Sequence, residues 1–308
     1  MQDNKTAYIL LLFTTLFWGG NAIAGKMAVG HISPMVLTSL RWTIALTILL
    51  LIGGKQFWQE RQLALKSLPL LFAYGALGFA IFNITLYSAL NYTSAINIAI
   101  EQAAVPAVIF IGNFILFRTR VTWLQIVGFS LSLVGVAIVA SNGKSLSNIA
   151  QLEVNRGDAY MALGVLVYAA YSVSLRYKPT MHWKTMTIPM AFSALIVSLP
   201  FSYFELQSGS SILPDQRGLL IALYTAYFPA IISQVLWVRG IELIGANRAG
   251  IFINLVPIIG TLLAVFILGE IFQLYHAIAL VFVIGGIWLA EKSGQSLVQM
   301  ALSNKTAP

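Results

Sequence analysis

The sequence predicts an all-α integral membrane protein in which ten transmembrane helices form two inverted five-helix repeats. Three observations support this fold class. Of the 308 residues, 58% are hydrophobic and 9% are charged, whereas a soluble domain has about 25% charged residues. Ten apolar runs follow one another along the chain, and each is long enough to cross the hydrocarbon core of a bilayer. The two halves of the chain also resemble each other.

The ten runs are joined by short connections, of which residues 141–157 and 205–216 are the longest. The first run is longer than the apolar part of a signal peptide and has no clear cleavage site after it, so we interpret it as a span. The expected spans are residues 7–29, 35–54, 68–90, 94–117, 121–140, 158–177, 185–204, 217–239, 247–268 and 272–290.

The basic residues predict how the chain is oriented. With the N-terminus inside the cell, 13 of the 18 Lys and Arg residues fall on the cytoplasmic side and five on the outer side. Because Lys and Arg concentrate in cytoplasmic loops, both termini are expected in the cytoplasm. The net charge of +8 then reflects these loops, and no nucleic-acid partner is expected.

The two halves align when they are offset by 151 residues, so that Pro106 faces Pro257 and Gly135 faces Gly286. Each half holds five spans, an odd number, so the second copy must insert upside down. The loops after spans two and four carry five basic residues, while their counterparts after spans seven and nine carry one. Inverted repeats are the architecture of secondary transporters, whose substrate site lies near the midplane. We expect repeat units at residues 7–140 and 158–290.

The sequence resembles the ten-helix EamA-type branch of the drug/metabolite transporter superfamily over about residues 7–291. The stretches that carry this resemblance are LFWGGNAIAGK (16–26), Ser33-Pro34 followed by Arg41, VPAVIFIGNFIL (105–116), VYAAYSVSLR (167–176), NLVPIIGTLLAVFILGE (254–270) and GGIWLA (285–290). The resemblance implies a secondary carrier of the bacterial inner membrane that moves small metabolites, often amino acids and often outward. The first half departs from the pattern, because Arg118-Thr119 stands where the second half has Gly269-Glu270.

Glu101 lies well inside the fourth span, whereas the other acidic residues, Asp158 among them, are expected in loops or at span ends. A carboxylate near the middle of a span costs about 2.5 to 3.5 kcal/mol, which makes a functional role its default explanation. Asn97 shares a helix face with Glu101. Burial favours the protonated acid, so Glu101 is interpreted as a proton-coupling group or as a partner for a substrate amino group. The alternative is a permanently neutral acid that is hydrogen-bonded within the protein.

Further polar and aromatic residues inside the spans are candidates for a substrate cavity. A polar group in lipid costs free energy unless it is paired, so we expect several of them to line one cavity. The deep aromatic rings could stack on a planar or apolar substrate, although core packing is the alternative for each. The candidates are Trp18, Asn21, Asn83, Tyr87, Tyr168, Tyr171, Gln234, Trp237 and Asn254.

Three basic groups and one tryptophan are expected near the outer or inner membrane surface. Arg41 and Lys26 are expected to snorkel or to pair with a substrate or an outer acid. His276 is expected to be a satisfied polar residue. Trp42 is expected in the interfacial aromatic belt.

Pro106 and Pro257 occupy corresponding positions in spans four and nine. A proline inside a helix lacks the N–H that would bond to the preceding turn, so it breaks or kinks the helix. Freed carbonyl groups at membrane depth are tolerated where they line a cavity or are buried in protein. We predict that both prolines act as helix hinges, with a kink that only improves packing as the alternative.

Other kinds of protein are not supported by the sequence. The GKS at 143–145 lacks the first glycine of a phosphate-binding loop, since Ile138 stands there, so ATP is not expected as an energy source. Without cysteine, an HExxH motif or an aspartate inside a span, no enzyme activity, metal or cofactor is expected. The expected partners are the lipid bilayer and a small-molecule substrate, with a monomer or weak homodimer as the assembly.

Two transport functions remain open. The first is proton- or gradient-driven export of a small metabolite, an amino acid or a related amphipathic compound. The second is import of a vitamin or nucleobase-like solute such as riboflavin. A non-transporting membrane enzyme or scaffold has little support, because no catalytic constellation or extramembrane domain is present.

Overall fold

The computed structural model describes residues 2–118, 122–141 and 155–303, and the regular structure of these residues is helical. The first half of the chain forms α1 (Gln2–Ala28), α2 (Pro34–Gln59), α3 (Arg61–Lys66), α4 (Leu68–Tyr74), the π-helix η1 (Gly75–Ile81), α5 (Phe82–Ala89), α6 (Ala95–Gln102), α7 (Val105–Phe117) and α8 (Trp123–Ala140). The second half forms α9 (Arg156–Ser174), η3 (Leu175–Tyr177), α10 (Trp183–Gln207), α11 (Gln216–Tyr227), the π-helix η4 (Phe228–Ile232), α12 (Ser233–Ile244), α13 (Ala246–Ile253), α14 (Leu255–Leu268) and α15 (Leu274–Ser303).

Eight helical segments are long and apolar enough to cross a membrane, and two shorter apolar helices, Leu255–Leu268 and Leu274–Ala290, follow them. Together they correspond to the ten predicted spans, so the prediction of an all-helical membrane protein is confirmed. The predicted ends were less accurate, since α2 continues to Gln59 and α12 to Ile244. The extension of α2 contains Lys55, Gln56 and Gln59, and that of α12 contains Glu242 among apolar residues.

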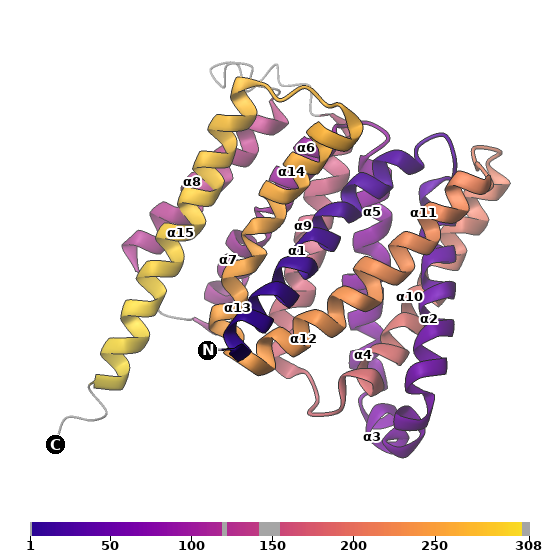
Figure 1. The fold of residues 1–308 in the computed structure, drawn as a ribbon, viewed down its shortest axis with the longest axis horizontal. Coiled ribbons are helices and arrows are strands. Elements are labelled where there is room, and N and C mark those ends of the chain that lie inside the picture. Colours follow the sequence, from indigo (N-terminus) through magenta and orange to yellow (C-terminus); the bar gives the residue numbers. More distant parts are fainter. Residues whose placement is uncertain (1, 119–121, 142–154, 304–308) are drawn as a thin grey trace.

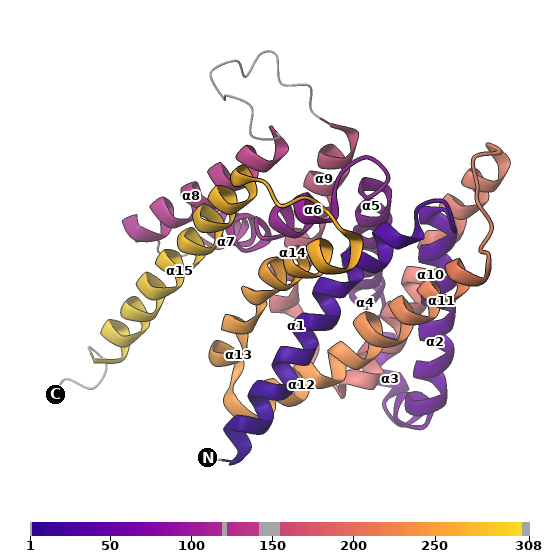
Figure 2. The ribbon, with the colours of Figure 1, turned by 45° about the horizontal axis from the view of Figure 1, so that its top comes forward.

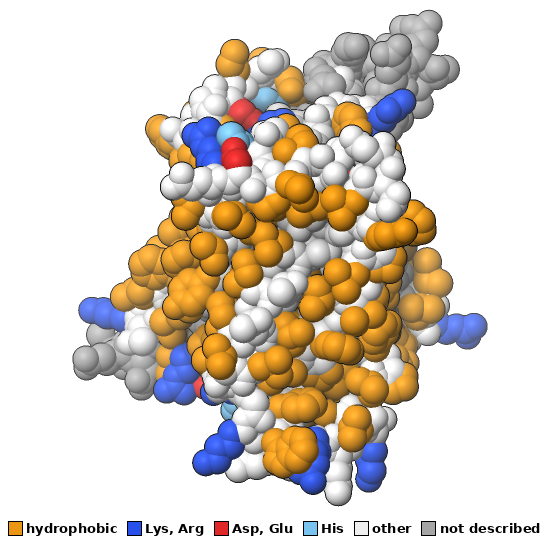
Figure 3. All heavy atoms as spheres, turned by 90° about the vertical axis from the view of Figure 1, so that its right-hand side faces the viewer, with side chains coloured by type: hydrophobic (Ala, Val, Ile, Leu, Met, Phe, Trp, Pro, Cys, Tyr) orange, Lys and Arg blue, Asp and Glu red, His pale blue; other side chains and the backbone are white. Residues whose placement is uncertain are grey.

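The outer surface of the bundle matches a lipid environment. Figure 3 shows one face as a band of apolar side chains between two ends that carry charged groups. The helices at this side, α2, α10 and α11, expose large apolar residues such as Leu51, Phe204 and Leu220. Such an extended apolar surface is not stable in water, whereas lipid tails accommodate it.

The first residues of α1 and the last residues of α15 lie toward the end of the bundle that holds α3, opposite to the turn that joins α14 to α15 (Figure 1). Near that turn, α6 occupies a central position, because it packs against α1, α8, α9, α14 and α15. Its residues Ile96, Ile98 and Ile100 are fully buried in the largest core cluster. Figure 2 shows α8 and α15 running side by side at one edge of the bundle.

Irregular backbone recurs at corresponding places in the two halves. The π-helices η1 and η4 interrupt spans three and eight, and both spans four and nine are split into two helices. Pro106 lies in the first turn of α7 and Pro257 in the first turn of α14, where a missing N–H costs little. The second helix of each span therefore starts near its proline. A hinge function for the two prolines stays a prediction.

Trp42 corrects the sequence-based expectation of an interfacial position. Its ring is buried and stacks on Phe79, with 4.6 Å between the ring centroids and an angle of 3° between the planes. The apolar run predicted the depth of the span but not the rotation of the helix about its axis, which turns this side chain toward α10 and the core.

Candidate functional site

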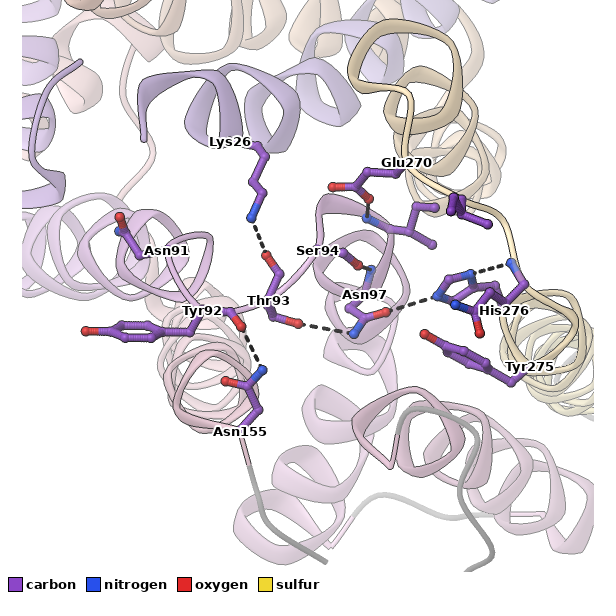
Figure 4. A pocket seen from close by; sticks show the side chains of 13 residues that line it. Lys26, Asn91, Tyr92, Thr93, Ser94, Asn97, Asn155, Glu270, Tyr275 and His276 are labelled. Atoms are coloured by element: carbon purple, nitrogen blue, oxygen red, sulfur yellow. Dashed lines mark hydrogen bonds between the residues drawn. The ribbon is translucent and has the colours of Figure 1, made fainter. Parts of the chain in front are cut away.

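A polar cavity of about 470 Å³ opens at the end of the bundle where the chain turns from α5 to α6 and from α14 to α15. We call it the end cavity, and Figure 4 shows its lining side chains. They come from α1, the two turns, the first residues of α6 and α15, and Asn155, the residue before α9. Its polar lining residues include Lys26, Thr93, Ser94, Asn97, Glu270 and His276.

Glu270 holds the N-terminus of α6 at the wall of this cavity. Its two carboxylate oxygens accept the backbone N–H groups of Ala95 at 2.8 Å and Ile96 at 2.9 Å. The Ser94 hydroxyl caps the same helix by accepting the N–H of Asn97 at 3.0 Å. A negative charge at this position satisfies free N–H groups and interacts favourably with the helix dipole. The sequence analysis assigned no role to Glu270.

Replacing Glu270 by Ala is expected to lower the free energy of unfolding by about 1.5 to 3 kcal/mol, because hydrogen bonds to a charged group contribute that much. Glu270→Gln retains one acceptor oxygen and is expected to lose less. Ser94→Ala, which removes one neutral cap, is expected to cost about 1 kcal/mol. Thermal unfolding of the purified proteins in detergent measures the stability of the three variants relative to the wild type. Equal stability of wild type and Glu270→Ala would contradict the capping role.

Lys26 is partly buried near the end of α1 and lies close to an acidic residue, which agrees with the second of its two expected roles. Its Nζ donates to the carbonyl oxygens of Leu90 at 2.9 Å and Thr93 at 2.8 Å. These carbonyls lie at the C-terminal end of α5, where a positive charge is favourable. The same ammonium interacts electrostatically with Glu270. Lys26 therefore joins α1 to the turn that forms the rim of the end cavity (Figure 4).

A chain of polar contacts crosses the floor of the cavity from α15 to the turn before α6 (Figure 4). The backbone N–H of Gln273 donates to Nδ1 of His276 at 3.0 Å. Nε2 therefore carries the ring proton in neutral His276, and it contacts Oδ1 of Asn97 at 3.2 Å. The Asn97 amide in turn donates to Oγ1 of Thr93 at 3.1 Å. Asn97, a predicted site residue, thus lines the end cavity.

Glu101 lies one turn beyond Asn97 on α6, and the structure places the carboxyl of Asp158 beside it. The two carboxyl groups interact electrostatically, and both side chains are buried, with 3% and 5% exposed surface. Asp158 belongs to the first turn of α9, and Gly157 there packs closely against Thr93. Asp158 lies at a span end, as the sequence analysis expected, but α9 turns it inward, and this burial was not predicted.

Of the partners expected for a permanently neutral Glu101, Asn97 bonds instead to Thr93 and His276, whereas a neighbouring helix, α9, does supply one in Asp158. When both carboxyls are ionised, the Glu101 oxygens have no hydrogen-bond donor among the described residues, and the Thr93 hydroxyl is the neighbouring donor for Asp158. Two ionised carboxylates repel each other strongly in a medium of low dielectric constant. One shared proton removes the repulsion and supplies a hydrogen bond between them. A shared proton would therefore satisfy both carboxyl groups, and a coupling role for Glu101 stays a prediction.

A second polar cluster surrounds Arg41 in the interior of the bundle. Its Nη1 donates to Oδ1 of Asn21 at 3.0 Å, to Oδ1 of Asn83 at 2.7 Å and to the hydroxyl of Tyr87. Tyr87 in turn donates to Oδ1 of Asn21 at 2.9 Å. Arg41 has 4% exposed surface, so the expectation that it snorkels is wrong. The structure brings three predicted site residues together around a cation that the sequence analysis left at the outer surface.

The remaining predicted residues lie away from the end cavity. Trp18 packs against Trp237, with 5.4 Å between ring centroids, and Tyr168 against Tyr171, also at 5.4 Å. Gln234 is partly buried on α12, and Asn254 stands at the break between α13 and α14. The predicted residues thus form several groups, and their roles in transport stay predictions.

A bundle of membrane-crossing helices with discontinuous segments, a polar cavity and buried ionisable side chains is the construction of a membrane transport protein. Residues 5–141 and residues 155–291 each match the EamA-like transporter family. The chain belongs to this family, which confirms the resemblance to EamA-type carriers, and it is a multi-pass membrane transporter and not an enzyme.

Similar proteins occur in bacteria and archaea. The chain is 28% identical to the uncharacterized transporter YyaM of Bacillus subtilis, over 92% of this chain and 93% of that protein. It is 25% identical to an uncharacterized transporter of Archaeoglobus fulgidus, over 85% and 90% of the two chains. A protein of known crystal structure shares the fold, with a TM-score of 0.64 and 19% identity over 95% of this chain and 99% of the other.

Proposed function

We propose that this transporter exports a small amphipathic metabolite, of the amino-acid type, in exchange for protons. The observation that carries the proposal is the buried carboxyl pair of Glu101 and Asp158. A pair that binds one proton on one side of the membrane and releases it on the other couples transport to a proton gradient. Its neighbour Thr93 lines the end cavity, and so does Tyr275, which interacts electrostatically with Asp158.

The proposed direction depends on the orientation of the chain. The distribution of basic residues, 13 against five, favours cytoplasmic termini in the bacterial inner membrane. The end cavity then opens toward the outer side, where protons are abundant in a respiring cell. The pair takes up a proton from the cavity and releases it after the bundle opens inward, while substrate leaves in the opposite direction.

Mass spectrometry of the growth medium tests the proposal. Cells that overproduce the wild type are expected to accumulate one metabolite outside, and cells that produce equal membrane amounts of Glu101→Gln are expected not to. Equal accumulation with both proteins would contradict the role of Glu101. Depletion of a compound from the medium would contradict export and favour import of a planar solute, for which the paired rings of Trp18 and Trp237 offer a stacking surface.

A further inference from the structure

The charge of Arg41 has no anionic partner among the residues that the structure describes. The ion pairs found among them are His31–Asp215 and Arg239–Glu242. The recorded contacts of Arg41 are with neutral groups, two amide oxygens and one phenol. The rings of Trp42 and Tyr87 lie 5.2 Å and 6.0 Å from its guanidinium carbon.

Burying a cation without a counter-ion is strongly unfavourable, and cation–π contacts and neutral acceptors offset only part of this cost. Hydrogen bonds that only hold helices together do not need a charged donor, because an amide side chain would donate to the same acceptors. An ionisable residue inside a membrane bundle is therefore a candidate for a functional site, and its missing partner indicates the ligand.

The hydrogen-bond pattern leaves one edge of the guanidinium free. Nη1 is the donor in all three hydrogen bonds of Arg41. Among the described residues, Nε is buried without a partner and Nη2 donates no hydrogen bond. Nε–H and the adjacent Nη2–H point in parallel along one edge, and this edge matches the two oxygens of a carboxylate. Asn21 and Asn83, from α1 and α5, hold the opposite corner in place.

We propose that Arg41 binds the carboxylate of the transported molecule, so that the substrate is a carboxylic acid or a zwitterion. This inference rests on the proposed function and specifies its substrate class. It separates the two transport hypotheses, because a neutral planar solute offers no anion to Arg41.

Access to Arg41 is closed in this conformation. A narrow crevice between α1, α2 and α5, lined by Leu37, Tyr87 and Asn91 among others, has a volume of about 10 Å³, which is room for about one water molecule. Asn91 also lines the end cavity. Arg41 itself has 4% exposed surface and does not line this crevice. A substrate therefore reaches Arg41 only when the surrounding helices separate, as alternating access requires.

The test is a binding measurement on the purified full-length protein with matched pairs of probes. Each pair joins a carboxylate to its analogue without one: L-phenylalanine with phenethylamine, L-leucine with isopentylamine, L-lysine with cadaverine, and benzoate with benzamide. Affinity is measured as saturable stabilisation against thermal unfolding in detergent. At least one carboxylate is expected to bind at millimolar or lower concentration, while its analogue does not.

Variants of Arg41 then assign the site. Arg41→Gln is expected to weaken carboxylate binding about 10- to 100-fold, the equivalent of a lost charged hydrogen-bond pair, and Arg41→Lys to weaken it less. The matched control is Arg239→Gln, because the Arg239 side chain is 61% exposed. This variant is expected to bind carboxylates like the wild type. If Arg41→Gln does not fold, two measurements still test the inference: the comparison of probe pairs on the wild type, and carboxylate binding to Arg41→Lys.

Three results would overturn the inference: no carboxylate binds to the wild type, both members of every pair bind equally, or Arg41→Gln binds carboxylates with unchanged affinity. Arg41-dependent binding of inorganic phosphate alone would replace a carboxylate by a phosphate ester as the ligand. Because the assay needs no gradient, carboxylate binding that persists in a protein without proton-coupled export would contradict the proposed coupling and leave the role of Arg41 intact.

Discussion

Glu101→Gln, reconstituted in proteoliposomes, is expected to lose transport driven by a pH gradient while it retains exchange of substrate across the membrane. Glutamine has nearly the volume of glutamate and preserves the packing of α6, but it cannot take up or release a proton. Asp158→Asn is expected to have the same effect, because in the proposed mechanism the proton is shared between the two neighbouring carboxyls. Gradient-driven uptake should fall to that of liposomes without protein, with exchange changed by no more than a few fold.

The assay uses a pH-sensitive dye inside the vesicles and the labelled metabolite that export experiments identify. Glu242→Gln is the matched control, because Glu242 is an exposed glutamate in an ion pair with Arg239, and it should transport like the wild type. A Glu101→Gln protein whose substrate flux still follows the pH gradient would show that the coupling lies elsewhere. Loss of exchange together with coupling would instead indicate a structural role for Glu101.

Gly286→Leu is expected to prevent folding, whereas Gly285→Leu, one residue away, is expected to fold. A Cβ atom at Gly286 would lie 2.2 Å from the carbonyl oxygen of Gly128 and 2.6 Å from Oγ of Ser132, while a Cβ at Gly285 would meet no atom within 4 Å. Small residues at such crossings allow two membrane helices to approach closely. Leucine at position 286 therefore forces α15 away from α8.

Size-exclusion chromatography and thermal unfolding of both variants in detergent measure this difference. Overpacking typically costs about 1 to 3 kcal/mol when a side chain can adjust, but at Gly286 the obstacle is backbone, so a larger loss is expected. Gly285→Leu replaces glycine by a better helix former and is expected to gain up to about 1 kcal/mol. Equal stability of the two variants would contradict the close contact between α8 and α15.

Glu101 and Asp158 illustrate how far the candidate site can be predicted from the sequence. Glu101 stands out because a charge interrupts a long apolar run, and this signal requires no knowledge of its neighbours. Asp158 follows a connection and looks like a span-end residue until the start of α9 and its inward face are known. Arg41 was misplaced for the same reason, since the distance from a span end does not reveal which helices surround a side chain.

The sequence by itself determined the membrane class, the number of spans and the family, because hydropathy and motif content are sums over neighbouring residues. Only the tertiary structure decided which polar groups meet: Glu101 with Asp158, Arg41 with Asn21, Asn83 and Tyr87, and Glu270 with the N-terminus of α6. Successive residues of a helix point about 100° apart, so the partner of a side chain depends on how each helix is rotated about its axis. That rotation is chosen when ten helices pack together, through close contacts such as Gly128 against Gly286, and no single span encodes it.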